Sequence, residues 1–506
     1  MKALKLLAFS AAVGLGGLLA TSCSEDILDI PPAANNTTDQ FYQNEGQISQ
    51  AVTAIYNGLL TLPSNVYWNM SELRSDNILT NIALVARDYS DISNFSATSQ
   101  TQQLQTTWTD LTQIVYRSNL LLQKIEPFTF ARVNQFKAEA RFLRALAYFD
   151  LVRLWGPVPI AETVLSATEA QQVPQAPIAD VYQFIIEDLK FAADNLPAAY
   201  TAADKGHATK WAAKALLGKV YLTGYGYPLR DASMLPLAKQ QLLEVYAQEG
   251  AATFSVAQNF ADLFKTANDN RYAVFEIQYI SGGTGLGSQV PWEQGNTFPS
   301  FWSPFTAGGP DIQVPPAFFG ANWPKIDRRK AATIDSVIRN PTTGALVAGR
   351  PQFTKFLEKG TTAPQNNRDY PNNFLLIRFE DVVLMYAEVL NEESSGPVPA
   401  LAVTLVNRIR TRSGILAYTN TSPERASKAA FRAAILKERR YEFVVEGQRW
   451  FDLVRTGTAL QTIMDFKRET NVPLGRQLDE HDLLFPLPLL ELSINPGFWQ
   501  QNPGYN

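Results

Sequence analysis

The apolar positions of this chain recur mainly at helical spacing. In residues 39–59, the apolar side chains return every three or four positions, at Phe41, Ile48, Val52, Ile55, Tyr56 and Leu59. This is the period of one face of an amphipathic helix. The same period returns in residues 108–122, 136–154, 181–196, 209–222, 374–391, 400–412 and 424–451. The chain is therefore predicted to be mainly α-helical.

Two of these predicted helices carry one residue pattern. Residues 140–148 (ARFLRALAY) and 213–221 (AKALLGKVY) share Ala, a basic residue, Leu, a small residue and a final Tyr at the same positions. Small residues let two helices approach closely. The two stretches lie about two periods of a ~34-residue helix-turn-helix repeat apart. The pattern predicts a degenerate tetratricopeptide-like array, with coincidence among Ala/Leu-rich helices as the alternative.

The middle of the chain departs from the helical period. Residues 271–279 alternate between apolar and polar positions, which predicts a strand. Residues 281–325 are rich in Gly, Pro and aromatic residues and show no period, and irregular segments of that length are usually functional. The glycines of residues 283–287 lack the spacing of a dinucleotide-binding fingerprint. Because Pro291 and Trp292 follow, we expect no helix N-terminus there to hold a phosphate.

The N-terminus has the order of a secretory signal. Lys2 and Lys5 are followed by an apolar run, residues 6–20, and then by small residues before Cys23, the only cysteine. The run is shorter than the ~20 residues of a spanning helix. The segment resembles a bacterial lipoprotein signal, in which Cys23 is acylated, although Ala20 stands where Leu is usual. An ordinary secretory signal or a membrane anchor is the alternative.

The residues after Cys23 suggest a tether. Ser24, Glu25 and Asp26 resemble the export tag of Bacteroidetes surface lipoproteins. Residues 27–38 are polar and contain prolines, as a linker between a lipid and a folded body would. We therefore expect a signal peptide in residues 1–22 and a lipidated tether in residues 23–38.

Composition excludes several function classes. The net charge is −4, so no basic face for nucleic acid is expected. The single cysteine allows no intrachain disulfide and no thiolate metal cluster. His207 and His481 are the only histidines, and neither a zinc-protease motif nor a nucleophile elbow occurs. We expect no metal, no cofactor and no catalysis, and we interpret His481-Asp482 as a turn or cap.

Residues 437–453 are dense in charges of both signs, with aromatic residues between them. Some of these charges must be partly buried, and a buried charge needs a partner. We expect a structural ion network in which four arginines pair with three acids: Arg408, Arg410, Arg439 and Arg449 with Glu438, Glu442 and Asp452.

Several stretches together resemble the SusD/RagB outer-membrane lipoproteins. They are residues 72–77 (ELRSDN), 140–145 (ARFLRA), 155–159 (WGPVP), 378–388 (RFEDVVLMYAE), 438–443 (ERRYEF), 449–455 (RWFDLVR), 485–488 (FPLP) and 501–505 (QNPGY). They follow the family's order and cover essentially the whole mature chain.

This resemblance implies four tetratricopeptide-like helix pairs as a scaffold, in an N-terminal region of residues 39–270. An irregular C-terminal region, residues 271–506, would carry much of the ligand surface, including a binding loop at 281–325. The family's partner is a SusC-like TonB-dependent transporter, over which the lipoprotein sits as a lid. Its members bind glycans, or peptides in RagB-like branches, and are not enzymes. A location at the cell outer membrane, facing the exterior, follows.

Ligand contacts are expected where aromatic and amide side chains meet, because sugar rings lie on flat aromatic faces while their hydroxyls need polar partners. One candidate group is a loop before Glu72, formed by Tyr67, Trp68 and Asn69. The other lies in and after the long loop: Trp292, Gln294, Asn296, Trp302 and Trp323. Ligand contact and plain loop packing remain open for each of them. Four other tryptophans are expected in the core: Trp108, Trp155, Trp211 and Trp450.

Three functions remain open from the sequence. The first is a glycan-binding lipoprotein that delivers its ligand to the transporter. The second is a RagB-like peptide receptor of the same transporter type. The third is a carbohydrate-active hydrolase, for which a pair of carboxylates would be needed. With 48 acidic residues, no such pair can be chosen from the sequence.

Overall fold

The structure is a computed structural model that describes residues 41–80, 87–252, 254–295, 312–339, 343, 345–358, 366, 368–472 and 474–505. The chain divides into two compact units, Met1–Gln50 and Ala51–Asn506. α2 (Glu45–Asn57) crosses the boundary between these units. The predicted division at residue 270 stays a prediction. Within the described residues, no helix is long and apolar enough to cross a bilayer.

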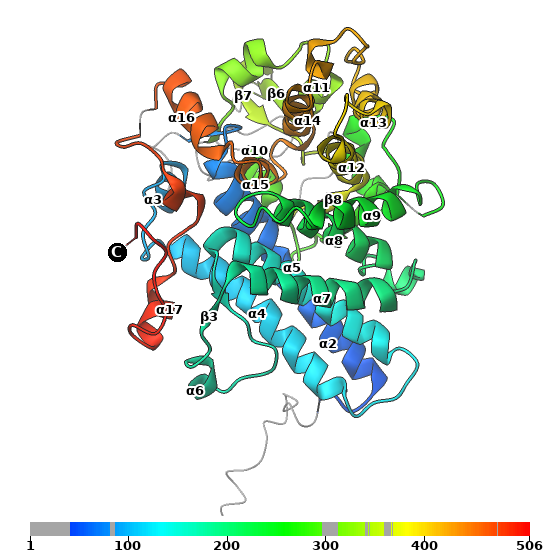
Figure 1. The fold of residues 1–506 in the computed structure, drawn as a ribbon, viewed down its shortest axis with the longest axis vertical. Coiled ribbons are helices and arrows are strands. Elements are labelled where there is room, and N and C mark those ends of the chain that lie inside the picture. The colour runs from blue at the N-terminus through cyan, green and yellow to red at the C-terminus, as the bar shows by residue number, and fades with distance from the viewer. Residues whose placement is uncertain are drawn as a thin grey trace, which may run out of the picture. The chain divides into compact units, whose positions relative to one another are not determined.

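Consecutive helices pack on one another in the first half of the larger unit. α4 (Gln102–Ile125), α5 (Val133–Trp155), α7 (Ile178–Asn195), α8 (Lys210–Tyr225) and α9 (Met234–Tyr246) each contact the next, as Figure 1 shows. The shared residue pattern lies in α5 and α8. In α8, a Cβ on Gly218 would lie 2.8 Å from Leu242 on α9, so the small residue permits the close helix pairing. The expected mainly helical, tetratricopeptide-like fold is confirmed.

A second helical group continues from this scaffold. α12 (Phe379–Glu393) packs on α9, and α13 (Ala400–Arg412) and α14 (Lys428–Phe443) pack on α12. The remaining α-helices are α3 (Arg87–Ser93), α6 (Ala167–Ala170), α10 (Val290–Gly295), α11 (Arg328–Thr333), α15 (Arg449–Arg455), α16 (Ala459–Glu469) and α17 (Leu489–Ile494).

Short 3₁₀ and π-helical segments connect these helices. Two of them are π-helical, η3 (Pro63–Ser71) and η8 (Phe318–Asn322). The 3₁₀ segments are η2 (Gly58–Thr61), η4 (Glu72–Arg74), η5 (Ala202–Asp204), η6 (Phe260–Phe264), η7 (Thr266–Asn268), η9 (Pro423–Arg425) and η10 (Glu480–Leu483). π-helical turns are rare and are often found at functional sites.

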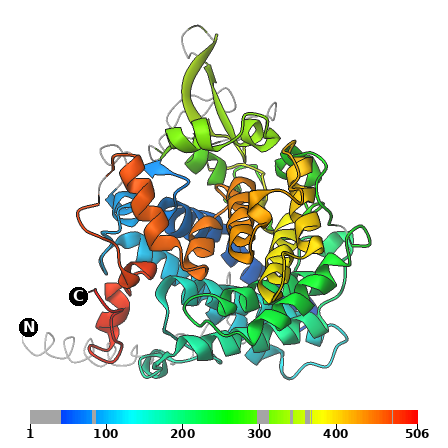
Figure 2. The same cartoon turned by 45° about the horizontal axis from the view of Figure 1, so that its top comes forward.

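Within the part of the chain that the structure describes, the strands form four antiparallel pairs. They are β1 (Leu79–Thr80) with β5 (Ile312–Gln313), β2 (Val158–Pro159) with β3 (Gln175–Ala176), β4 (Ala273–Ile277) with β8 (Phe374–Arg378), and β6 (Ile334–Arg339) with β7 (Leu346–Phe353). The predicted strand 271–279 is confirmed as β4. In Figure 2 the β6–β7 hairpin projects away from the helices.

Three helix predictions are wrong in part. Residues 374–378 form β8 because they pair with β4, where Phe275 faces Ile377. The predicted helix 424–451 breaks between α14 and α15. There Gly447 has φ of +74°, and a Cβ on it would lie 2.3 Å from that of Tyr67. Conversely, α10 forms where no helix was expected, since Pro291 stands at its second position, where the missing N–H costs no helical hydrogen bond.

A buried ion network joins the elements of the C-terminal half. Arg329 is fully buried and donates to Asp327 at 2.8 Å and to Glu442 at 3.0 Å. Arg378 donates to Glu442 at 2.7 Å and to Glu446 at 2.9 Å. Lys355 also binds Glu446. The charges are buried, and each faces an opposite charge.

The expected network therefore exists, but two of the four expected arginines pair with acids other than those predicted. The confirmed pairs are Arg410 with Glu438 at 3.0 Å and Arg439 with Asp452 at 2.7 Å. The wrong assignments are Arg408, which pairs with Glu249, and Arg449, which pairs with Asp76 at 2.8 Å. Both acids lie far away in the sequence, so local charge density could not reveal them.

Candidate functional site

Tyr67, Trp68 and Asn69 do not lie in an exposed loop, so that part of the sequence prediction is wrong. They belong to π-helical η3 and expose only 3%, 2% and 2% of their surface. The Tyr67 hydroxyl donates to Asp150 at 2.9 Å, and its ring stacks on Phe374 at 5.7 Å. Tyr67 is thus a packing residue, held in place by a strand and a helix that are distant in the sequence.

Trp323 is also a core residue, and its assignment to the ligand surface is wrong. Its side chain is fully buried, with ring centroids 5.1 Å from Phe318 and 5.3 Å from Tyr441. The indole N–H donates to Asp327 at 2.9 Å. Asp327 in turn accepts hydrogen bonds from Arg329, so Trp323 is bonded to the buried ion network through Asp327.

Of the remaining ligand-binding candidates, two lie in α10 and two lie outside the residues that the structure describes. Trp292 is half-buried, and the Arg368 guanidinium lies 5.0 Å from its ring centroid. Gln294 is buried and donates its amide N–H to the Val445 carbonyl at 2.9 Å. Asn296, Trp302 and the lipidation candidate Cys23 lie outside the described residues.

α10 packs against η3, and these two elements contain five buried polar atoms with no hydrogen-bond partner in the described structure. We call this group the α10–η3 patch: Trp68 Nε1, Asn69 Oδ1, Trp292 Nε1, Glu293 Oε2 and Gln294 Oε1. Buried polar groups in folded proteins are nearly always paired, and each unpaired one costs about 1–3 kcal/mol. Because five of them lie in two contacting elements, we take the α10–η3 patch as the candidate site for a polar ligand.

Glu293 is the titratable group of the patch. Burial raises the pKa of its carboxyl to about 8, and the hydrogen bond from Ser64 and the charge of Arg368 offset only part of that rise. Glu293 is therefore a neutral acid at pH 7. In that form it can donate a hydrogen bond as well as accept one.

A chain of amide hydrogen bonds fixes the orientation of Asn69. Asn65 donates to Asp110 at 2.7 Å, and Gln103 donates to Asn65 at 3.1 Å. Asn69 then donates to Gln103 at 3.2 Å. Because its amide nitrogen is used in this chain, the Asn69 oxygen is the atom left for a ligand.

Tyr89 on α3 completes the group. Burial raises the pKa of its phenol to about 12, with the neighbouring Glu293 adding to the rise and Asn69 opposing it. Sequence reasoning missed Tyr89 and Arg368, because both come from segments distant from α10. The acidic Glu293 lies between the candidate residues Trp292 and Gln294, so the sequence does place an acid in this segment.

The larger unit also has hollows away from the α10–η3 patch. A cavity of about 360 Å³ beside α8 is lined by Tyr200, His207, Trp211 and Asn270, among others. Asn270 is paired there with Gln278 at 2.9 Å. Trp211 was expected in the core but is half-buried in this wall. It is the second residue of α8, whose start Thr209 caps, so it lies in the first turn of the helix.

Two adjoining hollows of about 300 and 580 Å³ lie between η8, α14 and α16. Both are lined by Arg440 and Arg449. These two arginines are already paired with Asp76, at 3.0 and 2.8 Å. Their donors are used within the protein, unlike the polar atoms of the α10–η3 patch.

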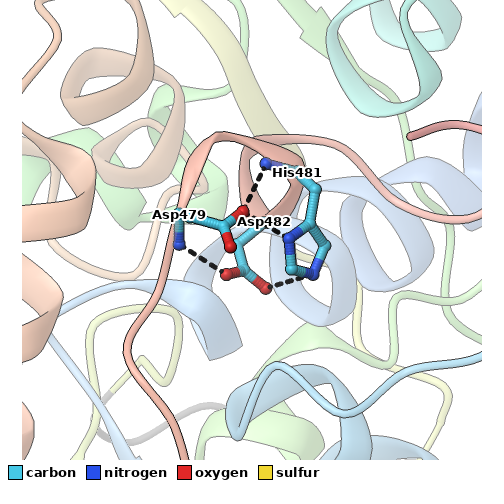
Figure 3. A group of neighbouring side chains, drawn as sticks. All are labelled: Asp479, His481 and Asp482. Carbon is cyan, nitrogen blue, oxygen red and sulfur yellow. Dashed lines mark hydrogen bonds and ion pairs between the residues drawn. The ribbon is translucent and has the colours of Figure 1, made fainter. Parts of the chain in front are cut away.

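Asp479, His481 and Asp482 form the cluster drawn in Figure 3, with potential ligand atoms within 4.8 Å of one another. Asp479 caps η10 by accepting the His481 N–H at 3.0 Å, and Asp482 accepts the Asp479 N–H at 2.9 Å. Asp482 also binds Arg476 at 2.7 Å. The prediction of a cap is confirmed, and the cluster's polar atoms are already engaged in capping and ion pairing.

A family model described as "SusD family" matches residues 228–505, and one described as "Starch-binding associating with outer membrane" matches residues 28–222. SusD-like protein P25 of Formosa agariphila is 25% identical, and the alignment covers 94% of each chain.

Solved structures show the same fold. A SusD homolog from Bacteroides thetaiotaomicron has a TM-score of 0.81 at 24% identity, covering 92% of this chain and 98% of that one. A laminarin-binding SusD-like protein has a TM-score of 0.75 at 27% identity, covering 92% of this chain and 100% of that one.

Proposed function

The chain belongs to the SusD family, and we propose that it is a surface lipoprotein that binds glycans and delivers them to a SusC-like TonB-dependent transporter. The observation that carries glycan binding is the α10–η3 patch, whose unpartnered polar atoms lie in the two elements that hold Trp68 and Trp292. The laminarin-binding relative supports the same ligand class.

The patch has the chemistry that a sugar needs. A pyranose offers one apolar face and several hydroxyl groups, and it binds where an aromatic ring adjoins fixed polar groups. Trp292 supplies a half-buried ring. Asn69 holds an oriented acceptor and neutral Glu293 holds both a donor and an acceptor; both are buried at 2% and 3% exposure, so a sugar hydroxyl reaches them only when α10 or η3 shifts. Tyr89 supplies a further hydroxyl beside Asn69.

Membrane attachment is proposed at Cys23, with acylation after removal of residues 1–22. Mass spectrometry of the mature N-terminus tests it, since the proposal requires a lipid on Cys23. A Cys23→Ala variant should be released from the outer membrane. An unmodified Cys23 in the membrane fraction would contradict this part of the proposal.

Partnership with a transporter is a separate part of the proposal. Extraction of the native outer membrane in mild detergent, followed by capture of this protein, should co-purify a TonB-dependent barrel in a fixed ratio. Recovery of the protein without any barrel would contradict the partnership and leave the glycan-binding part intact.

Calorimetric titration with a panel of polysaccharides and peptides tests the binding function. The proposal predicts saturable binding of at least one glycan and unchanged ligand afterwards, as judged by chromatography of the recovered sugar. Released products would indicate a hydrolase. Binding of peptides alone would favour the RagB-like function.

A further inference from the structure

Arg368 is the charged residue beside the patch, and its charge is not balanced locally. Its side chain is exposed and lies over the ring of Trp292. Its backbone N–H binds Asn366 at 2.9 Å, while its guanidinium forms no ion pair with any described residue. The guanidinium therefore holds several N–H donors in a planar fork that is open to a ligand.

Neither the adjacent Asp369 nor the neighbouring Glu293 forms an ion pair with Arg368. The neighbouring Asp369 turns toward the 281–283 segment, where it accepts the N–H groups of Gly282 and Gly283 at 2.9 Å each. Glu293 interacts electrostatically with Arg368, but its burial keeps it protonated at pH 7. Arg368 thus remains a cation at the rim of an otherwise neutral patch.

The position of Arg368 also limits which ligands can stack on the ring of Trp292. The guanidinium covers one face of the indole, so a neutral sugar stacking on that face must displace it. An anionic sugar can bind the N–H edge of the guanidinium while the cation stays on the ring. Paired planar contacts of this kind are among the stronger hydrogen bonds in proteins.

Given the proposed glycan-binding function, we infer that the preferred ligand is an acidic glycan, whose carboxylate or sulfate group binds the exposed Arg368 over Trp292 while its hydroxyls face the α10–η3 patch. A uronate and a sulfate ester share the anionic oxygens that a guanidinium recognises. An acidic peptide could also supply a carboxylate, but it lacks the ring hydroxyls that the amide and acid groups of the patch would bind.

Matched ligand pairs test the inference by calorimetry. The first pair is a mannuronate oligomer and the mannose oligomer of equal length and linkage. The second is a sulfated galactan oligomer before and after desulfation. An oligoglutamate peptide is the fifth ligand. We expect one anionic glycan to bind about tenfold more tightly than its neutral counterpart, and the preference to shrink as salt is raised.

Two arginine variants assign the preference to this site. Arg368→Gln should abolish it. Arg271→Gln is the matched control, because Arg271 is also exposed and lies over an aromatic ring, Tyr272, at 5.3 Å. That control should keep the preference.

The outcomes separate the inference from the proposed function. Equal binding of neutral and anionic glycans, or a preference that survives in Arg368→Gln, would overturn the inference alone. Tighter binding of oligoglutamate than of any glycan would overturn the assignment of a glycan ligand. Binding of none of the five would contradict both.

Discussion

The ion network and the α10–η3 patch are both polar and buried, yet they differ in whether opposite charges face one another within them. In the ion network, Arg378 meets Glu442 and Glu446 within 2.9 Å. In the patch, atoms such as Glu293 Oε2 and Asn69 Oδ1 meet no partner in the described structure. Burial of polar groups alone therefore indicates neither stability nor binding. The pairing of opposite charges separates the two: Glu438 Oε1 and Arg412 Nη1 in the network also make no hydrogen bond, but both side chains are ion-paired.

Titration behaviour shows the same contrast. Burial opposes ionisation of Glu442, but facing guanidinium groups of Arg412, Arg378 and Arg329 overcome it and hold the pKa of Glu442 well below its usual range. Burial of Glu293 has no comparable compensation and raises its pKa to about 8. The acid in the network is a fixed anion, and the acid in the patch is a neutral hydrogen-bonding group.

Breaking the network should have the largest effect. Arg378→Met leaves Glu442 and Glu446 buried with fewer counter-charges, and we expect a loss of about 3–5 kcal/mol in the free energy of unfolding. Chemical denaturation measures it. Adding Glu446→Gln to the same chain should restore part of the loss. Arg271→Gln should change stability by less than about 0.5 kcal/mol. A loss of similar size there would contradict the assignment.

The pH dependence of stability should identify Glu293. Its carboxyl titrates near 4.5 in the unfolded chain and near 8 in the folded one. As pH rises between these values, the unfolded state ionises first, so this residue lowers stability progressively and the loss is complete above pH 8. Glu293→Gln removes that loss.

Denaturation at pH 5 and pH 8 measures this effect. The stability of Glu293→Gln relative to the natural chain should increase by about 2–4 kcal/mol between the two pH values. The exposed Glu480→Gln is the control and should show no such trend. A relative stability of Glu293→Gln that does not depend on pH would show that Glu293 is ionised in the folded protein.

Trp323→Phe should separate packing from binding. The variant loses the hydrogen bond to Asp327 and part of the ring contact with Tyr441, so we expect a stability loss of about 1–3 kcal/mol. Glycan affinity should stay within about twofold, as calorimetry would show. A tenfold weaker glycan affinity in a folded variant would contradict this assignment and show that Trp323 contributes to glycan binding.

The helical scaffold could be predicted because its signals are local. Apolar period and small residues within α5 and α8 depend only on neighbouring positions, and they gave the correct fold class. The site depends on contacts between distant segments. Tyr67 is buried because Gly447 lets another segment approach it, and Arg368 reaches Trp292 from a separate strand connection. A sequence shows which residues are aromatic, but not which faces of them are covered.

The most direct test of the α10–η3 patch compares two half-buried tryptophans. Trp292→Ala and Trp211→Ala remove similar rings, one at the patch and one at the 360 Å³ cavity beside α8. With the tightest ligand of the panel, calorimetry should show at least about tenfold weaker binding for Trp292→Ala and unchanged binding for Trp211→Ala. The reverse result, or unchanged binding by both folded variants, would contradict the assignment of the patch as the ligand site.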